Sequence, residues 1–178
     1  MVDYSIVRGP VPEAMRRIVD MHDAYYGSLW GFGPAFTQKN ITELTEFLGR
    51  FDPDRDGLWT AQVDGRVEGS VAIVGSRAVT VHAELRWFLV SDVLRDRGAG
   101  SRLLEAALDF CRDRAFSKVT LWTFAGLDRA RRLYDCAGFV LQEERLGSRW
   151  GTEVMEQRLE LDVRATAEQM LPTDAQDA

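Results

Sequence analysis

A glycine pair surrounded by arginines follows a stretch that is typical of a buried strand. Apart from Arg86, Leu85 to Val90 is apolar and aromatic, and Gly98 and Gly100 interrupt this pattern directly before a helical one. Positive charge surrounds the loop, on Arg95, Arg97 and Arg102. Glycine lets the backbone approach a ligand closely, and the first N–H groups of a helix have no partner within that helix. The stretch therefore favours binding of a phosphate or pyrophosphate over an ordinary glycine turn.

The spacing of these residues excludes two better-known phosphate loops. No Lys-Ser or Lys-Thr pair follows the second glycine, as a nucleotide-triphosphate P-loop requires, and the third glycine of the dinucleotide fingerprint is missing. Arg95, Gly98 and Gly100 instead fit the pattern Arg/Gln-x-x-Gly-x-Gly/Ala. A second segment, RRLYDCAGFVLQEE, places a Leu-Tyr pair on a helix ahead of Gly-Phe. The glycine motif followed along the chain by the Leu-Tyr motif is a more specific signal than either motif alone.

In these two motifs the chain resembles the GNAT family of N-acetyltransferases, roughly from Val63 to Leu161. The resemblance implies an α/β (α+β) GNAT fold: a mixed, mostly antiparallel central sheet of about seven strands, about four flanking helices and a splayed long strand. It implies acetyl-CoA as co-substrate and no metal. The long-strand region also resembles GNAT modules fused to MarR-type regulators, although this chain has no room for such a domain.

The resemblance also implies how acetyl-CoA is held. Backbone amides from Arg97 to Ser101 would meet the pyrophosphate, with charge from Arg95 and Arg102, while the main chain near Leu89 would bind the pantetheine arm. The predicted cofactor-binding residues are Phe88, Leu89, Val90, Arg95, Arg97, Gly98, Ala99, Gly100, Ser101, Arg102 and Thr123. The chain departs from the family at Leu127, where asparagine is frequent, which puts one pantetheine hydrogen bond in doubt.

Two residues are predicted to act in catalysis. Tyr134 stands in the Leu-Tyr pair, where the family places its general acid, and a phenol with a pKa near 10 suits a thiolate leaving group. Glu84, on the long strand, occupies a position from which several family members present a base. The alternative for Glu84 is an ion pair with an arginine such as Arg86.

An irregular segment rich in aromatic residues, YYGSLWGFGPAF, is either a loop that packs on itself or the wall of a pocket. In the family, this connection lines the acceptor site. The predicted substrate-binding residues are Tyr25, Tyr26, Trp30 and Phe32. His22, on the preceding helix, is interpreted as a packed or partly exposed helix residue and not as a catalytic base, since no carboxylate or nucleophile nearby marks it.

Hydrophobic periodicity predicts the remaining elements. The expected helices span 13–26, 41–51 with Asn40 as N-cap, a segment after Gly100 with Leu103 to Cys111 on its buried side, and 127–136. The expected strands span 4–8, 58–63, 66–74, 78–90, 118–123, 139–145 and 152–161. Asp64-Gly65 is the strongest hairpin signal, because it supplies the positive φ angles of a tight turn.

Length and composition indicate an ordinary globular protein. The 178 residues are 46% hydrophobic and 28% charged, which suits one domain over 1–163 and a flexible tail over 164–178. The net charge of −6 argues against broad nucleic-acid binding. Without an apparent signal or membrane-spanning segment, the protein is expected to be cytoplasmic and not membrane-bound. Neither Cys111 nor Cys136 lies in a CxxC pair, and both are expected to be buried.

Two classes of function are compatible with these features. The first is an enzyme that acetylates a primary amine, on a small molecule or a peptide, by direct attack in a ternary complex. The second is a non-catalytic module of the same fold that senses acyl-CoA or binds a partner. A homodimer through the last strands or the aromatic segment is expected by analogy with the family.

Overall fold

A computed structural model describes residues 2–11, 13–76 and 81–164 of the chain. Its strands are β1 (Ser5–Arg8), β2 (Gly57–Val63), β3 (Arg66–Gly75), β4 (His82–Val90), β5 (Lys118–Phe124), β6 (Val140–Gly147) and β7 (Val154–Asp162). Its helices are α1 (Ala14–Trp30), α2 (Pro34–Gly49), α3 (Ala99–Asp113) and α4 (Asp128–Cys136). The predicted 78–90 strand is found from His82, and its first residues lie outside the described residues, as do Arg77 of the predicted turn and all but Arg164 of the predicted tail.

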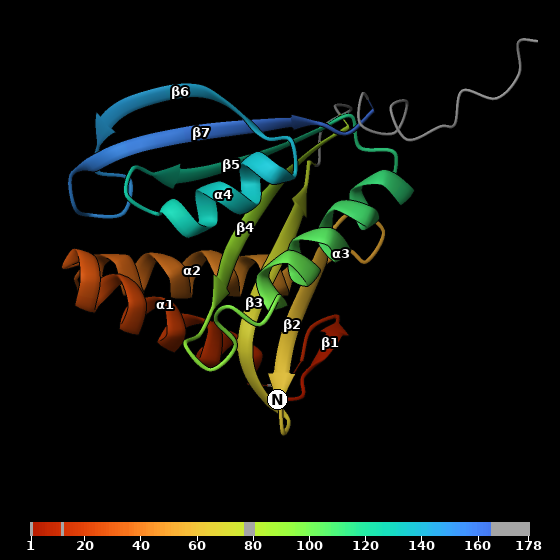
Figure 1. The fold of residues 1–178 in the computed structure, drawn as a ribbon, viewed down its shortest axis with the longest axis horizontal. Helices are drawn as coiled ribbons and strands as arrows, with labels where there is room; N and C mark the ends of the chain where they lie inside the picture. The colour runs from red at the N-terminus through yellow and green to blue at the C-terminus, as the bar shows by residue number, and fades with distance from the viewer. Residues whose placement is uncertain (1, 12, 77–80, 165–178) are drawn as a thin grey trace, which may run out of the picture.

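The described strands form one mixed sheet in the order β1-β2-β3-β4-β5-β7-β6 (Figure 1). Every neighbouring pair is antiparallel except β4 and β5. These two parallel strands pair only where His82–Glu84 meets Lys118–Thr120, and β4 continues beyond that point without β5. The predicted mixed sheet with a splayed long strand is therefore confirmed. The edge of β4 that faces the gap keeps its backbone groups available for a ligand.

A bulge in β4 decides which side chains face the gap. Ala72 pairs with Arg86 and Ser70 pairs with Leu89, so β4 holds one residue more than β3 over this stretch. Trp87 lies at the bulge and has a φ of 47°. Its carbonyl accepts a hydrogen bond from Ser70 Oγ at 2.7 Å. Beyond the bulge the alternation is reversed, so that Phe88 and not Trp87 shares a face with α3.

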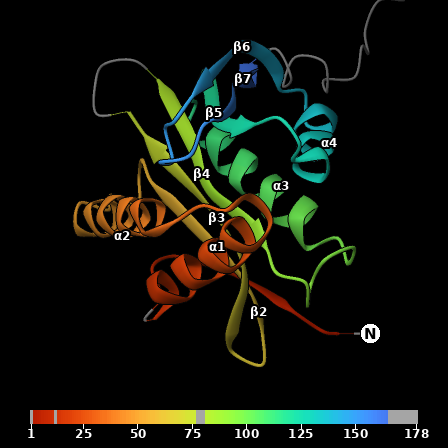
Figure 2. The ribbon, with the colours of Figure 1, turned by 90° about the vertical axis from the view of Figure 1, so that its left-hand side faces the viewer.

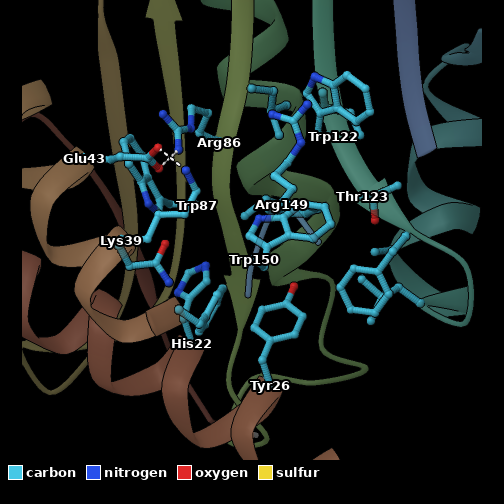
Figure 3. Close-up of a pocket in the computed structure, with 18 of the residues that line it drawn as sticks. His22, Tyr26, Lys39, Glu43, Arg86, Trp87, Trp122, Thr123, Arg149 and Trp150 are labelled. Carbon is cyan, nitrogen blue, oxygen red and sulfur yellow. Dashed lines mark hydrogen bonds and ion pairs between the residues drawn. The ribbon is translucent and has the colours of Figure 1, made fainter. Parts of the chain in front are cut away.

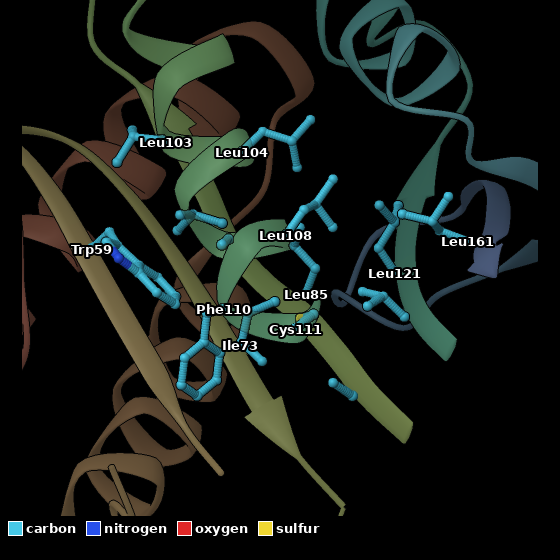
Figure 4. Packing of buried hydrophobic residues seen from close by; sticks show 14 of the residues in the cluster. Trp59, Ile73, Leu85, Leu103, Leu104, Leu108, Phe110, Cys111, Leu121 and Leu161 are labelled. Carbon is cyan, nitrogen blue, oxygen red and sulfur yellow. The ribbon is translucent and has the colours of Figure 1, made fainter. Parts of the chain in front are cut away.

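The two faces of the sheet carry separate cores. On one face α3 packs its buried stripe, which the sequence predicted from Leu103 to Cys111, against β2, β3, β4 and β5 (Figure 4). On the opposite face α1 and α2 pack against alternate residues of the same strands, including Leu58 and Ala72 (Figure 2). Helices α3 and α4 thus lie on one side of the sheet, and α1 and α2 lie on the other.

The first two helices differ from the sequence-based prediction. Helix α1 continues through Gly27 to Trp30, because the aromatic residues of its last turns pack in a cluster with Phe124. Helix α2 begins at Pro34, whose fixed φ suits the first turn, so the predicted start at Ile41 is wrong. Asn40 is consequently a buried residue inside α2 and not an N-cap. Only three residues separate the helices, so the aromatic segment is largely helical.

Strand β6 forms an exposed edge of the sheet. Strand β6 pairs with β7 on one side only, and Val140 and Leu146 on it are 60% and 63% exposed. The predicted dimerisation through these strands stays a prediction. No helix within the described ranges is both long enough and apolar enough to span a bilayer.

A buried carboxylate links α1 to the start of the glycine loop. Glu68 on β3 is 3% exposed and accepts two hydrogen bonds from Arg17 of α1, at 3.0 and 3.1 Å. Its side chain also accepts a hydrogen bond from Ser91 Oγ, and its backbone carbonyl accepts one from the Ser91 amide at 2.8 Å. This network holds the end of β4 in place, where the chain turns into the loop before α3.

Replacing Glu68 with alanine is expected to lower the free energy of unfolding by about 3 kcal/mol, because it leaves Arg17 with an uncompensated, partly buried charge. Asp109→Ala, which removes the 60% exposed carboxylate paired with Arg112, should cost less than about 1 kcal/mol. Urea denaturation of both variants measures the difference. Equal losses would show that the Glu68 network is no stronger than a surface ion pair.

Candidate active site

A groove of about 720 Å³ runs beside the splayed end of β4, between the loop before α3 and helix α4. Gly98 caps α3 with a φ of 78°, and Ala99, Gly100 and Ser101 form its first turn, whose N–H groups have no partner within the helix. The predicted cofactor-binding residues that line this groove are Phe88, Leu89, Val90, Arg95, Gly98, Gly100 and Ser101. The structure thus brings the strand end and the helix N-terminus to one surface, as an extended phosphate-bearing ligand requires.

The three arginines of the loop occupy different places. Arg95 lines the groove, ion-pairs with Asp92 and places its guanidinium 5.8 Å from the ring centre of Tyr25. Arg97 uses its amide and its Nε in hydrogen bonds to Leu94 and Val93 of the same turn. Arg102 stacks 4.9 Å from the Tyr4 ring. Neither Arg97 nor Arg102 lines the groove, so Arg95 is the loop arginine placed to contribute charge there.

Gly100 lines the groove and leaves little space for a side chain. A Cβ atom added there would lie 3.1 Å from Cδ1 of Leu133 and 3.7 Å from side-chain atoms of Phe88 and Val90. All three neighbours line the groove, so a larger residue would fill the space into which the helix N-terminus points. The absence of a side chain fits the close backbone approach that a pyrophosphate needs.

Helix α4 forms the opposite wall of the groove. Arg129 and Arg132 line it, with Arg129 held by Asp96 at 2.8 Å, and both are placed to meet further phosphate charge. Leu127 at the N-cap of α4 offers no side-chain hydrogen bond. Cys136, the last residue of α4, is exposed and lines the groove, so the expectation of a buried thiol is wrong for it; Cys111 is buried.

A second, smaller pocket of about 280 Å³ adjoins the groove and is lined by residues of β4 and β5 among others (Figure 3). Four residues line both cavities, which therefore meet at Tyr26, Phe88, Leu127 and Ala130. The walls of the small pocket come from α1, α2, the bulge of β4, strand β5, helix α4 and the loop between β6 and β7. A group held at the end of the groove would thus face a separate chamber for a second reactant.

Tyr134 of α4 lines the small pocket close to the junction. Its ring packs between Phe88 and Phe139, with centroid distances of 5.9 and 5.8 Å, and its side chain is buried. Burial raises the pKa of the Tyr134 hydroxyl above its ordinary value, and the neighbouring Tyr26 adds to the effect. The phenol is therefore a proton donor at neutral pH.

Glu84 also lines the small pocket, at the last paired residue of β4 before the strands separate. Its side chain is 40% exposed, and its carboxylate lies 4.0 Å from Nε of Arg86. The arginine partner considered as an alternative is thus present, but the contact is long. Arg86 makes its closer ion pair with Glu43 of α2, which leaves the Glu84 carboxylate facing the pocket.

Glu43 is placed between two cations. It ion-pairs with Lys39 at 2.6 Å and with Arg86, and these partners hold the pKa of its carboxyl below the usual value against the opposing effect of burial. The carboxylate is thus ionised and engaged. This excludes it as a free base and leaves Glu84 as the carboxylate available for that role.

The predicted aromatic wall is partly in place. Tyr26 and Phe32 line the small pocket and stack at 5.6 Å, whereas Tyr25 lines the groove beside Arg95. Trp30 lines neither cavity, because it packs edge-on against Phe124 at 4.9 Å. Thr123, predicted to bind the cofactor, lines the small pocket and not the groove.

Several pocket residues were not predicted from the sequence. Arg149 and Trp150 come from the loop between β6 and β7, and Trp122 comes from β5. The signal that was available is the aromatic and basic content of LGSRWG between two strands, where a plain turn would carry small polar residues. His22 was interpreted as a packed residue; it is buried, yet it lines the pocket.

His22 makes a buried hydrogen bond within its own helix. Its Nδ1 lies 2.7 Å from the carbonyl oxygen of Ile18, and burial lowers its pKa to about 4. A neutral ring donates Nδ1–H to that carbonyl and keeps a lone pair on Nε2. With so low a pKa, His22 is a hydrogen-bond acceptor at neutral pH and a weak proton acceptor.

The same burial predicts an acid sensitivity. His22 has a lower pKa in the folded state than its ordinary 6.5, so its contribution to stability is complete above pH 6.5 and is lost as the pH falls toward 4. Between pH 7 and pH 4 the loss is about 3 kcal/mol. Urea denaturation should show a weaker pH dependence for His22→Gln than for wild type, with exposed His82→Gln as control. Parallel pH profiles for wild type and His22→Gln would contradict this.

Among residues 2–11, 13–76 and 81–164, no group of three or more His, Cys, Asp and Glu side chains is arranged to hold a metal ion.

Comparisons with known proteins agree with this geometry. The family model "Acetyltransferase (GNAT) family" matches residues 15–139. The protein named "Probable N-acetyltransferase camello" from Xenopus tropicalis is 28% identical over 115 residues, which cover 64% of this chain and 51% of that protein. The chain thus corresponds to about half the length of that curated relative.

Solved structures share the fold. A GNAT-family acetyltransferase from Staphylococcus aureus superposes with a TM-score of 0.71 at 14% identity, over 90% of this chain and 99% of that one. The yncA protein from Salmonella typhimurium, solved with acetyl-CoA, gives a TM-score of 0.68 at 14% identity over 99% of both chains. At such identities the superpositions show the fold alone. With the family model covering most of the chain, the protein belongs to the GNAT family of acetyltransferases.

Proposed function

We propose that the protein transfers the acetyl group of acetyl-CoA to a primary amine by direct attack in a ternary complex. The observation that carries the proposal is the meeting of two cavities at Tyr26, Phe88, Leu127 and Ala130. The groove joins the splayed end of β4 to the N-terminus of α3, which suits a pantetheine arm and a pyrophosphate. The smaller pocket holds the candidate acid and base, which suits an acceptor entering from the opposite side.

The chemistry assigned to the chain follows from this arrangement. Bound acetyl-CoA supplies an activated thioester; the amine nitrogen forms a bond to its carbonyl carbon while the bond from that carbon to sulfur breaks. Backbone N–H groups on the unpaired edge of β4, between Phe88 and Val90, are placed to polarise the carbonyl. Tyr134 donates its hydroxyl proton to the departing thiolate. Arg95 and the first turn of α3 hold the pyrophosphate.

The amine must lose a proton before or during attack. We assign its removal to Glu84, directly or through water, because the carboxylate faces the pocket and Glu43 is engaged by Lys39 and Arg86. Its contact with Nε of Arg86, at 4.0 Å, is long for an ion pair and leaves the carboxylate oxygens of Glu84 for this role. Neither cysteine is assigned a covalent role, since Cys111 is buried in the core and Cys136 lies on the far wall of the groove.

Initial-velocity kinetics test the direct attack. With acetyl-CoA and an accepted amine varied together, a ternary complex predicts double-reciprocal lines that intersect. Parallel lines would require a covalent acetyl-enzyme and would contradict the proposal. Binding of acetyl-CoA without turnover of any amine would favour the alternative function, a module that senses acyl-CoA.

The cellular setting forms part of the proposal. The described cysteines are both free thiols, which suits a reducing compartment and supports the cytoplasmic location predicted from the sequence. The acceptor is proposed to be a small-molecule or peptide amine, and a homodimer remains the predicted assembly.

A further inference from the structure

The small pocket carries more positive than negative groups. Three cationic side chains line it, Lys39, Arg86 and Arg149, against the two carboxylates of Glu43 and Glu84. Glu43 is already engaged by Lys39 and Arg86. Arg149 also faces the buried Glu156, which does not line the pocket. The surface that an acceptor meets is therefore more positive than negative, although the whole chain has a net charge of −6.

Arg149 is the cation with free donors. Its guanidinium lies 3.8 Å from the ring centre of Trp122, and its Nε faces the buried Glu156 at 3.8 Å. Within the described part of the chain, its guanidinium makes no hydrogen bond, and its ion pair with Glu156 is long. The side chain is 32% exposed. Stacking on Trp122 therefore orients a guanidinium whose outer edge is available for a bidentate partner such as a carboxylate.

Two further donors belong to residues of the pocket walls and lack a partner among the described residues. Nδ2 of Asn40 and Nε1 of Trp87 are buried and make no hydrogen bond there. Buried polar groups are almost always paired, so these donors favour an occupant that brings acceptor oxygens to the walls. This observation is independent of the charge count and points to the same chemistry.

The charged groups lie away from the cavity junction. Figure 3 shows Arg86, Arg149 and Trp122 at one end of the pocket and Tyr26, which lines both cavities, at the other. An acceptor with its amine at the junction would therefore extend its other end toward the arginines. A carboxylate on that end would pair with Arg149, while the aromatic walls would enclose the carbon skeleton between the two groups.

Resting on the proposed acetyl transfer, we propose that the acceptor is a small amine that also carries a carboxylate, in the class of the amino acids. Arg149 binds the carboxylate and determines this specificity, with Arg86 adding charge at the same end. The amine nitrogen lies at the junction, near Tyr134; Glu84, which lies 4.0 Å from Arg86 and so toward the arginine end, takes up the amine proton through water.

Matched acceptors test the class. Leucine, leucinamide and isoamylamine share a side chain and an amine, but only leucine carries a carboxylate; the corresponding sets for phenylalanine and glutamate cover other skeletons. In a thiol-release assay, kcat/KM for the preferred amino acid should exceed that for its amide and its decarboxylated amine at least about tenfold. A decarboxylated amine or a polyamine used as well as the amino acid would overturn the inference.

A pair of variants isolates Arg149. Arg149→Gln should lower kcat/KM for the amino acid by about 10- to 100-fold and change that for the decarboxylated amine less than about twofold. Arg145→Gln is the control, because Arg145 also faces Glu156, at 3.6 Å, and Trp122, at 5.4 Å, yet does not line the pocket. Equal effects of the two substitutions on amino-acid turnover would contradict the role of Arg149.

The failure of this inference is distinct from failure of the proposed function. If no amine is acetylated although acetyl-CoA binds, the acetyl transfer itself is wrong. If amines without a carboxylate are acetylated best, transfer stands and the assignment of Arg149 is wrong.

Discussion

Replacing Gly100 with valine is expected to weaken acetyl-CoA binding at least 100-fold, on the order of 3 kcal/mol or more. A Cβ atom there already meets Leu133 at 3.1 Å, and the two methyl groups of valine would extend toward Phe88 and Val90 across the floor of the groove. The helix N-terminus would then be separated from the pyrophosphate by a side chain. Titration calorimetry with acetyl-CoA measures the loss directly.

Gly49→Val is the matched control, because the space around that glycine at the end of α2 is open and distant from the groove. Its acetyl-CoA affinity should equal that of wild type. Thermal unfolding of Gly100→Val checks that the variant is folded. A folded Gly100→Val protein that binds acetyl-CoA with wild-type affinity would show that the pyrophosphate does not lie at the start of α3.

Replacing Tyr134 with phenylalanine is expected to lower kcat by about 100- to 10,000-fold while acetyl-CoA affinity stays unchanged. Phenylalanine preserves the packing against Phe88 and Phe139, so the loss reports the hydroxyl alone. Single-turnover rates and calorimetry separate the two effects. A variant with the wild-type kcat would remove Tyr134 from the mechanism.

The same residue predicts the alkaline side of the pH profile. Burial raises the pKa of Tyr134 above 10, the ordinary value for a tyrosine. The phenol therefore stays protonated at pH 10, and deprotonation of Tyr134 reduces the enzyme's activity only at higher pH. In wild type, kcat should therefore rise to a plateau that is maintained up to pH 10. A fall in kcat between pH 8 and pH 9.5 in a protein that remains folded would contradict the assignment of Tyr134 as the acid.

Local signals predicted most of the fold. The Asp64-Gly65 turn and the stripe of α3 were predicted because each depends on residues close in sequence, and both are present in the structure. The end of α1 and the start of α2 were not predicted correctly. For α1 the reason is that Gly27 is tolerated inside a helix whose last turns pack against Phe124. The Gly33-Pro34 pair was the overlooked start signal for α2.

Candidate site residues that lie close together in the sequence could be predicted, whereas residues that come from distant segments could not. The loop and the start of α3 form one continuous segment, so Arg95, Gly98 and Gly100 could be proposed from their spacing together with the family resemblance. Arg149 reaches the pocket from a loop whose position depends on the pairing of β6 with β7, which no local pattern reveals. The bulge at Trp87 likewise reverses the side-chain alternation of β4 and cannot be found from periodicity.

Release of thiol from acetyl-CoA in the presence of a panel of amines, with mass spectrometry of the acceptor, tests the central claim most directly. The predicted result is turnover of at least one amine, an acetylated product in equal amount to the thiol, and loss of both signals in Tyr134→Phe. Failure of the folded protein to bind acetyl-CoA or to acetylate any amine of the panel would contradict the account.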